Sequence, residues 1–183
     1  MIASDKELMA IFERTYGPIK RQETHAMRTK TPSVTYGYKS SPVPTGPEYV
    51  LVDGYNIIFA WDELKAIAKD NLDAARTQLI HILRNYQGFK QCKVIIVFDA
   101  YKVKGNPGSV ERYGDLSVVY TKEAEIADVY IERVTHELSK KHRVRVATSD
   151  GLEQVIILGH GALRVSASSF REEVQMVEKA IRE

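Results

Sequence analysis

Residues 50–56 read VLVDGYN, an apolar run that meets a carboxylate and a glycine without any polar transition. Aspartate is a poor strand former and is costly to bury without a partner, so a strand that ends in Asp53 needs an explanation. The same ending recurs in VIIVFDA, which reaches Asp99, and in VRVATSD, which ends in Asp150. Three apolar strands that each finish in an acid indicate a shared role for the three acids.

The chain around these stretches alternates between short apolar runs and longer segments with apolar residues at helical spacing. Strands are predicted at residues 49–53, 93–99, 116–120, 144–148 and 163–165. Helices are predicted at residues 71–86, 123–141 and 152–158, and from residue 172 onward. A Gly/Pro loop is predicted at residues 100–114, and no element is predicted at residues 54–70. This alternation predicts an α/β fold with a mainly parallel sheet that is covered by helices on both faces.

Particular residues are expected to mark the ends of two helices. Asn71 is the predicted N-cap of the helix at residues 71–86, and Gly88 is its predicted stop. Ser169 and Glu172 match an S-x-x-E capping box, which is expected to begin the last helix.

Composition places the chain among soluble globular proteins. Its 183 residues are 44% apolar and 27% charged, which suits one main domain with a core of useful size. No apolar run reaches the roughly 18 residues of a membrane span, and no signal-peptide pattern opens the chain. We therefore expect a cytoplasmic protein with no membrane partner. The single cysteine, Cys92, opens an apolar strand and is expected to be a buried thiol.

Charge divides the chain into two parts. Residues 1–47 contain seven Lys or Arg against four Asp or Glu, whereas residues 48–183 contain 19 against 20. The first part includes TKTPSVTYGYKSSPVPTGP, in which Pro, Gly, Ser and Thr oppose regular structure. We therefore predict an N-terminal extension and linker at residues 1–47 and a domain at residues 48–183. An arm folded back on the domain remains an alternative, because the extension has apolar residues to bury: Val34, Tyr36, Tyr38 and Val43.

The acids at the strand ends predict a site for a hard cation. In an open α/β sheet, ligands bind beyond the carboxyl ends of the strands. If the strands that end in Asp53, Asp99 and Asp150 are neighbours, about 4.8 Å apart, their carboxylates converge. Clustered carboxylates need a counter-charge, and oxygen donors without a His or Cys cluster favour Mg²⁺ or Mn²⁺.

A further acid comes from the helix predicted at residues 123–141. Asp128 stands three residues after Glu125, so the two are expected to share a helix face. The neighbours of Asp128 in the sequence are apolar, which suggests that it faces inward. The competing explanation is that acids complement the dipole in the first turn of a helix, and it applies above all to Glu123.

Several stretches occur in a defined order: VDGYNII with Trp61, Ala75 with Arg76, VFDAYKV, VVYTKEAEIAD, VATSD with Gln154, and Gly161 with Ala162. Together they resemble the YacP-like NYN family of PIN-like metal-dependent ribonucleases over about residues 48–183. The resemblance implies a PIN-like three-layer α/β fold, a Mg²⁺ or Mn²⁺ cofactor, and endonucleolytic cleavage of single-stranded RNA. Some members act on messenger RNA at the ribosome.

The resemblance also implies roles for individual residues. Carried across position by position, the catalytic and metal-binding acids are Asp53, Asp99, Asp128 and Asp150. The supporting polar groups are Asn56, Glu125, Thr148 and Ser149.

Basic and aromatic residues of the loop at residues 100–114 are the predicted RNA contacts. Lys102, Lys104 and Arg112 offer contacts to phosphates, and Tyr101 and Tyr113 offer stacking surfaces. An ordinary solvated loop remains the alternative. A second basic cluster, at residues 140–145, follows a helix C-terminus, whose dipole alone accounts for several such charges.

Residues 1–30 carry a separate resemblance, through KELMAIFERTYGPIKRQ at residues 6–22. This stretch is similar to the C-terminal end of ribosomal-protection-type translation GTPases, which implies the ribosome as a partner. A non-catalytic RNA- or ribosome-binding module with a vestigial acidic site remains the alternative to an enzyme.

Overall fold

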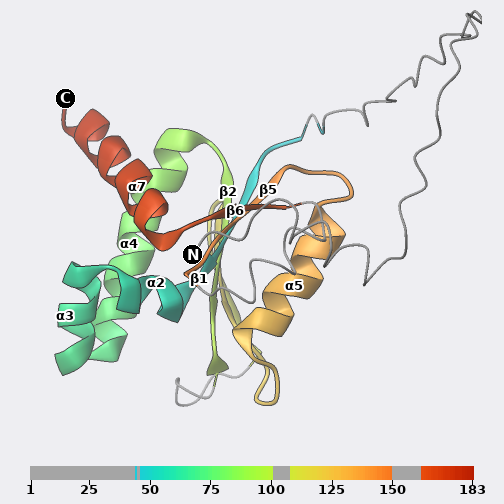
Figure 1. Ribbon diagram of the computed structural model, residues 1–183, viewed down its shortest axis with the longest axis horizontal. Helices are drawn as coiled ribbons and strands as arrows, with labels where there is room; N and C mark the ends of the chain where they lie inside the picture. Colours follow the sequence, from blue (N-terminus) through green and yellow to red (C-terminus); the bar gives the residue numbers. More distant parts are fainter. Residues whose placement is uncertain (1–43, 45, 101–107, 150–161) are drawn as a thin grey trace, which may run out of the picture. The chain divides into compact units, whose positions relative to one another are not determined.

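The structure, a computed structural model, describes residues 44, 46–100, 108–149 and 162–183 (Figure 1). The described residues form a six-stranded sheet in the order β3-β4-β2-β1-β5-β6. Its strands are β1 (Tyr49–Asp53), β2 (Lys93–Phe98), β3 (Val110–Tyr113), β4 (Leu116–Tyr120), β5 (Val144–Ala147) and β6 (Leu163–Val165). Neighbouring strands run parallel except for β3 and β4. The predicted mainly parallel sheet is confirmed.

Helices cover both faces of this sheet. Those of the described residues are α2 (Gly54–Ala60), α3 (Asp62–Asp70), α4 (Leu72–Lys90), α5 (Ala127–Leu138) and α7 (Ala167–Arg182). In Figure 1, α5 lies on one side of the sheet, and α4 and α7 lie on the other. The three-layer α/β arrangement is therefore confirmed. No helix in the described ranges is long and apolar enough to cross a membrane.

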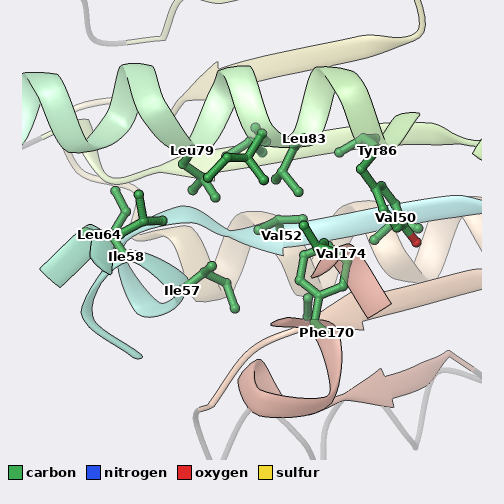
Figure 2. Packing of buried hydrophobic residues seen from close by; sticks show 14 of the residues in the cluster. Val50, Val52, Ile57, Ile58, Leu64, Leu79, Leu83, Tyr86, Phe170 and Val174 are labelled. Carbon is green, nitrogen blue, oxygen red and sulfur yellow. The ribbon is translucent and has the colours of Figure 1, made fainter. Parts of the chain in front are cut away.

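The alternating side chains of β1 contribute to two separate cores. Val50 and Val52 pack with residues of α2, α4 and α7 in one buried cluster (Figure 2). Leu51 points to the opposite face and packs with residues of α5. A central strand that is covered on both faces has to be apolar at consecutive positions, which explains the run VLV.

The ends of α4 are only partly as predicted. Asn71 caps this helix as expected, because its Oδ1 accepts a hydrogen bond from the backbone N–H of Ala74 at 3.1 Å. Gly88 does not stop the helix, which continues to Lys90. Gln91 is the C-cap residue, and it adopts a left-handed conformation with φ of 56°.

The starts of α5 and α7 also differ from the predictions. Ser166 caps α7 by accepting a hydrogen bond from the backbone N–H of Ser169 at 3.1 Å, so the predicted box of Ser169 and Glu172 is wrong. The helix α5 begins at Ala127 rather than at residue 123, and it ends three residues earlier than predicted. An apolar stripe locates a helix on the chain, but hydrogen bonds at its termini decide the first and last residues.

Some elements were not predicted at all. Residues 54–70 form α2 and α3, and β3 lies inside the predicted loop at residues 100–114. The strands β2 and β5 each end one residue earlier than predicted. The predicted helix at residues 152–158 lies outside the described residues.

Cys92 is a buried free thiol, as predicted, and is 6% exposed. Burial raises the pKa of this thiol. It is therefore a poor nucleophile, because the thiolate is the reactive form.

Candidate active site

The strands β2, β1 and β5 are neighbours and run parallel, so their carboxyl ends lie together at one end of the sheet. A hollow with a volume of about 360 Å³ lies at these carboxyl ends. Its described polar lining consists of Asp53, Asn56, Asp99, Asp128 and Ser149, and α2 adds Tyr55, Phe59 and Ala60. The structure thus brings together three of the four predicted acids and two of the four predicted supporting residues.

Asp53 is the last residue of β1 and immediately precedes α2. It is 6% exposed and so nearly buried. The chain turns into α2 at once because Gly54 has no side chain. A Cβ at residue 54 would lie 2.3 Å from Cε1 of Phe98, which is the last residue of β2. The DG pair therefore allows β1 to end in an acid while the next helix starts against its neighbour.

Asp99 follows β2 directly and is fixed by the helix on the other face of the sheet. Its Oδ1 accepts a hydrogen bond from the backbone N–H of Ala127 at 2.5 Å. The N-cap residue of α5, Ile126, makes no side-chain capping bond, so Asp99 supplies the acceptor that this helix start needs. This bond also positions Asp128, which is the second residue of α5.

Asp128 lines the hollow as predicted, but the apolar residues beside it in the sequence explain its orientation only in part. Ala127 is buried, whereas Ile126 and Val129 are 51% and 50% exposed. The position of Asp128 follows also from the start of α5 beside Asp99.

Asn56 connects α2 to the segment that follows β5. Its Oδ1 accepts a hydrogen bond from the backbone N–H of Ser149 at 2.6 Å and a second bond from the Ser149 hydroxyl. Thr148 is fully buried and does not line the hollow, and its backbone N–H donates to the carbonyl oxygen of Val165 at 3.2 Å. These two predicted supporting groups therefore fix the backbone just before Asp150.

Glu125 does not share a helix face with Asp128, because it lies in the turn that precedes α5. Its Oε1 accepts a hydrogen bond from Nη2 of Arg133 at 2.8 Å. Glu125 is absent from the described lining of the hollow. Its observed role is to tie the turn to the second turn of α5.

The remaining predicted residues are described only in part. Asp150, Tyr101, Lys102 and Lys104 lie outside the described residues. Arg112 and Tyr113 are consecutive residues of β3, so their side chains point to opposite faces. Arg112 lines a hollow on the side of α5, whereas Tyr113 lines a groove on the side of α4. The structure does not bring these two predicted RNA contacts together.

Comparisons with known proteins bear on the family and the fold of this chain. The sequence profile of the YacP-like NYN domain matches residues 50–183. The chain belongs to the YacP-like NYN domain family. Uncharacterized protein YacP of Bacillus subtilis strain 168 is 41% identical over 135 residues, which cover 73% of this chain and 79% of that protein. The family predicted from the residues is confirmed, and NYN domains are typically nucleases.

Solved structures support the same relationship. The crystal structure of Rae1 (YacP) from Bacillus subtilis is similar with a TM-score of 0.64 and 41% identity, covering 73% of this chain and 77% of that chain. A mutant of Rae1 gives a TM-score of 0.64 at 38% identity, covering 74% of this chain and 79% of that chain. The mainly parallel α/β fold is thus shared with solved structures of the family.

The donor atoms of the hollow fit the hard divalent cation that NYN domains generally use. Carboxylate, amide and hydroxyl oxygens are the ligands that Mg²⁺ and Mn²⁺ prefer. Across the described ranges, no three His, Cys, Asp or Glu side chains are placed to hold a metal ion together. The described residues alone therefore do not form a complete ligand set.

Phe59 is a lining residue that sequence reasoning missed. It lies on α2 and is 47% exposed. An aromatic ring beside an acidic hollow offers a stacking surface to a nucleotide base. Asn56, Phe59 and Ala60 have the i, i+3, i+4 spacing of one helix face, and this spacing was the available signal. It went unused because no helix was predicted at residues 54–70.

Proposed function

We propose that this protein is a Mg²⁺- or Mn²⁺-dependent endoribonuclease that cleaves single-stranded RNA by phosphodiester hydrolysis. The observation that carries the proposal is that one hollow is lined by Asp53, Asp99 and Asp128, which come from the end of β1, the residue after β2 and the start of α5. Three carboxylates that line one hollow offer the oxygen donors that a divalent cation takes, and a catalytic role explains why separate parts of the chain supply them. Membership of a family whose domains are typically nucleases supports the same conclusion.

We propose Asp53, Asp99, Asp128 and Asp150 as the acids that hold the cation. A bound divalent cation supplies a water of lowered pKa and neutralises charge that develops on the phosphate. Either Asp99 or Asp150 orients the attacking water. The bond from Ala127 occupies Oδ1 of Asp99 and leaves Oδ2 for this purpose. The products are 5′-phosphate and 3′-hydroxyl ends.

The supporting residues act by positioning. Asn56 holds the backbone and hydroxyl of Ser149, and it thereby fixes the residue just before Asp150. Thr148 contributes through its buried position between β5 and β6. Glu125 acts at a distance from the hollow by stabilising the start of α5 through Arg133.

RNA and the ribosome are the proposed partners in the cytoplasm. We assign phosphate contacts to Lys102, Lys104 and Arg112 and stacking contacts to Tyr101 and Tyr113. The resemblance of residues 6–22 to the end of ribosomal-protection-type GTPases supports action on messenger RNA at the ribosome.

A cleavage assay with metal removal tests this function. The full chain is incubated with a labelled single-stranded RNA in EDTA, and Mg²⁺ or Mn²⁺ is then added in excess. We expect no cleavage in EDTA and restored internal cleavage with either cation. Undiminished cleavage in EDTA would contradict the hydrolysis mechanism. Binding of RNA without cleavage in either cation would instead identify a binding module with a vestigial site.

A further inference from the structure

A second hollow runs along α4 on the side of the sheet edge formed by β3 and β4. It has a volume of about 340 Å³, which lies within the range of small-ligand sites. One wall is a strip of α4 residues at helical spacing: Asp73, Arg76, Thr77, Ile80, His81 and Arg84. The other wall consists of Glu111, Tyr113 and Tyr120. We call this hollow the α4–β3 groove.

The groove begins beside the acidic hollow. Arg76 lines the groove and donates a hydrogen bond from Nη1 to the hydroxyl of Tyr55 at 3.0 Å, and Tyr55 lines the acidic hollow. The ring of Tyr120 stacks on the ring of Phe98, with the ring centroids 5.8 Å apart. The ring centroids of Phe98 and Tyr55 are 5.0 Å apart. Tyr55, Phe98, Arg76 and Tyr120 therefore form a continuous wall between the two hollows.

The groove then extends away from the acidic hollow. Tyr120 is at the carboxyl end of β4, whereas Tyr113 pairs with Leu116 at its amino end. Along α4, the lining residues Asp73 and Arg84 are eleven positions apart, which corresponds to about 16 Å of helix. A groove of this length has room for a few nucleotides of an extended strand.

The far end of the groove presents an exposed cation on an aromatic ring. Cζ of Arg84 lies 4.8 Å from the centroid of the Tyr113 ring. Within the described part of the chain, no carboxylate pairs with Arg84. Arg76, in contrast, is buried and paired with Asp73, and Glu111 accepts a hydrogen bond from the Tyr113 hydroxyl at 3.2 Å. Arg84 is thus available for a phosphate, and Tyr113 holds its guanidinium in place.

We propose that the α4–β3 groove binds the single-stranded RNA that flanks the cleaved bond, with Arg84 on a phosphate and Tyr113 beneath a base or the guanidinium. A planar guanidinium on an aromatic ring suits both phosphate contact and base stacking, which are the two means of binding a single strand. Only the wall of Tyr55, Phe98, Arg76 and Tyr120 separates the groove from the proposed cleavage site. The choice of RNA as the ligand rests on the proposed function. The test measures RNA binding and does not depend on cleavage.

The test measures binding of a 12-nucleotide single-stranded RNA by fluorescence anisotropy, with the full chain in EDTA. Arg84→Gln and Tyr113→Ala are each expected to weaken binding by roughly tenfold, because contacts of this kind dominate single-strand affinity. Arg84→Gln should also reduce the slope of log K against log salt by about 0.7, whereas Tyr113→Ala should not. Lys179→Gln on α7 removes an exposed charge outside the groove and should bind within twofold of the parent. All four proteins should have the same melting temperature.

The outcomes separate this inference from the proposed function. If the parent fails to bind the RNA, or if Arg84→Gln and Tyr113→Ala bind as tightly as the parent, the groove is not an RNA site. Cleavage by the parent with Mn²⁺ is read separately. If the parent cleaves RNA and both variants bind it normally, the proposed nuclease function stands and the proposed RNA site in the groove is wrong. If binding depends on Arg84 and Tyr113 but the parent never cleaves RNA, the proposed RNA site in the groove stands and the proposed nuclease function is wrong.

Discussion

Gly54 is needed for space rather than for conformational freedom. Its φ is not positive, and the obstacle to a side chain is the ring of Phe98. The missing side chain lets the start of α2 pack directly against the end of β2, beside the residues Asp53 and Asp99. The packing beside the acidic hollow therefore requires glycine at residue 54.

Gly54→Ala is therefore expected to destabilise the protein by about 1 to 3 kcal/mol, because the methyl group overpacks the site. Gly88→Ala is a matched control, since a Cβ at residue 88 would meet nothing within 4 Å beyond its chain neighbours and the adjacent backbone of α4. Alanine is the better helix former, so this control should gain up to about 0.5 to 1 kcal/mol. Urea unfolding of both variants measures the difference. Equal stability of Gly54→Ala and the parent would show that Phe98 moves aside freely.

Asp99 combines a structural and a proposed catalytic role, which two substitutions separate. Asp99→Asn keeps an oxygen that accepts from Ala127, so the free energy of unfolding should change little. Asp99→Ala removes the acceptor and should cost about 1 kcal/mol, the usual cost of losing a helix cap. Both variants should lose cleavage of RNA by orders of magnitude. Equal destabilisation of the two variants in urea unfolding would argue against the capping bond.

At the scale of elements, an ion-pair network joins α7 to the sheet and to α4. Arg145 of β5 donates from Nη1 and Nη2 to the two carboxylate oxygens of Glu173 at 2.9 and 3.0 Å. Its Nε donates to Glu48 at 2.7 Å, and the Tyr86 hydroxyl donates to Glu173 at 2.6 Å. Such a bidentate arrangement is among the stronger hydrogen-bonded pairs in proteins. Arg145 therefore has a structural role within the basic cluster at residues 140–145.

The network predicts a stability change in acid. The hydrogen bond from Arg145 lowers the pKa of Glu173 from 4.5 to about 2. Since the folded state binds the proton more weakly, the contribution of Glu173 is complete above pH 4.5 and is lost as the pH falls from 4.5 toward 2. Glu173→Gln should cost about 2 kcal/mol at pH 7, because it breaks bonds to a charged partner.

Glu172→Gln, at the neighbouring exposed position of α7, is the control, and it should be as stable as the parent within about 0.5 kcal/mol. Urea unfolding at pH 7, 5, 4 and 3 provides the measurement. The stability gap between the parent and Glu173→Gln should narrow by about half or more at pH 3. A gap of the same size at pH 7 and pH 3 would contradict the assigned pKa.

The sequence predicted strands better than helix ends, for a physical reason. The strands β1 and β2 are buried on both faces, so an unbroken apolar run marks them directly. The helix α2 is short, begins with glycine and buries apolar residues on several sides, so it lacks an amphipathic stripe. The strand β3 is exposed at all four positions, so burial leaves no pattern in its sequence.

The candidate site was predictable to the extent that strand ends determine it. Asp53 and Asp99 follow from the apolar runs that precede them, and the order of β2, β1 and β5 places them together. The position of Asp128 depends on a hydrogen bond between Asp99 and Ala127, which no local pattern contains. Glu125 was misplaced because the start of α5 was predicted four residues too early.

At the scale of the whole molecule, we propose that residues 1–47 are an extension to a domain that folds without most of them. Both buried clusters are built from residues of the described domain between Tyr49 and Val177. A chain that starts at residue 44 retains Gly46, beside His142, and Glu48, in the network with Arg145. It should unfold cooperatively with the melting temperature of the full chain. A fall of many degrees would favour an arm that packs on the domain.

The central claim is that the acidic hollow cleaves RNA, and the single-turnover cleavage rate of Asp128→Asn tests it most directly. Asp128 lines the hollow, and its replacement by asparagine removes one charge with little change in shape. Asp70→Asn makes the same change at an exposed position of α3. With single-stranded RNA and Mn²⁺, we predict a rate at least about a hundredfold lower for Asp128→Asn, because it loses electrostatic stabilisation of the transition state. Asp70→Asn should cleave like the parent, and a rate for Asp128→Asn equal to that of Asp70→Asn would contradict the account.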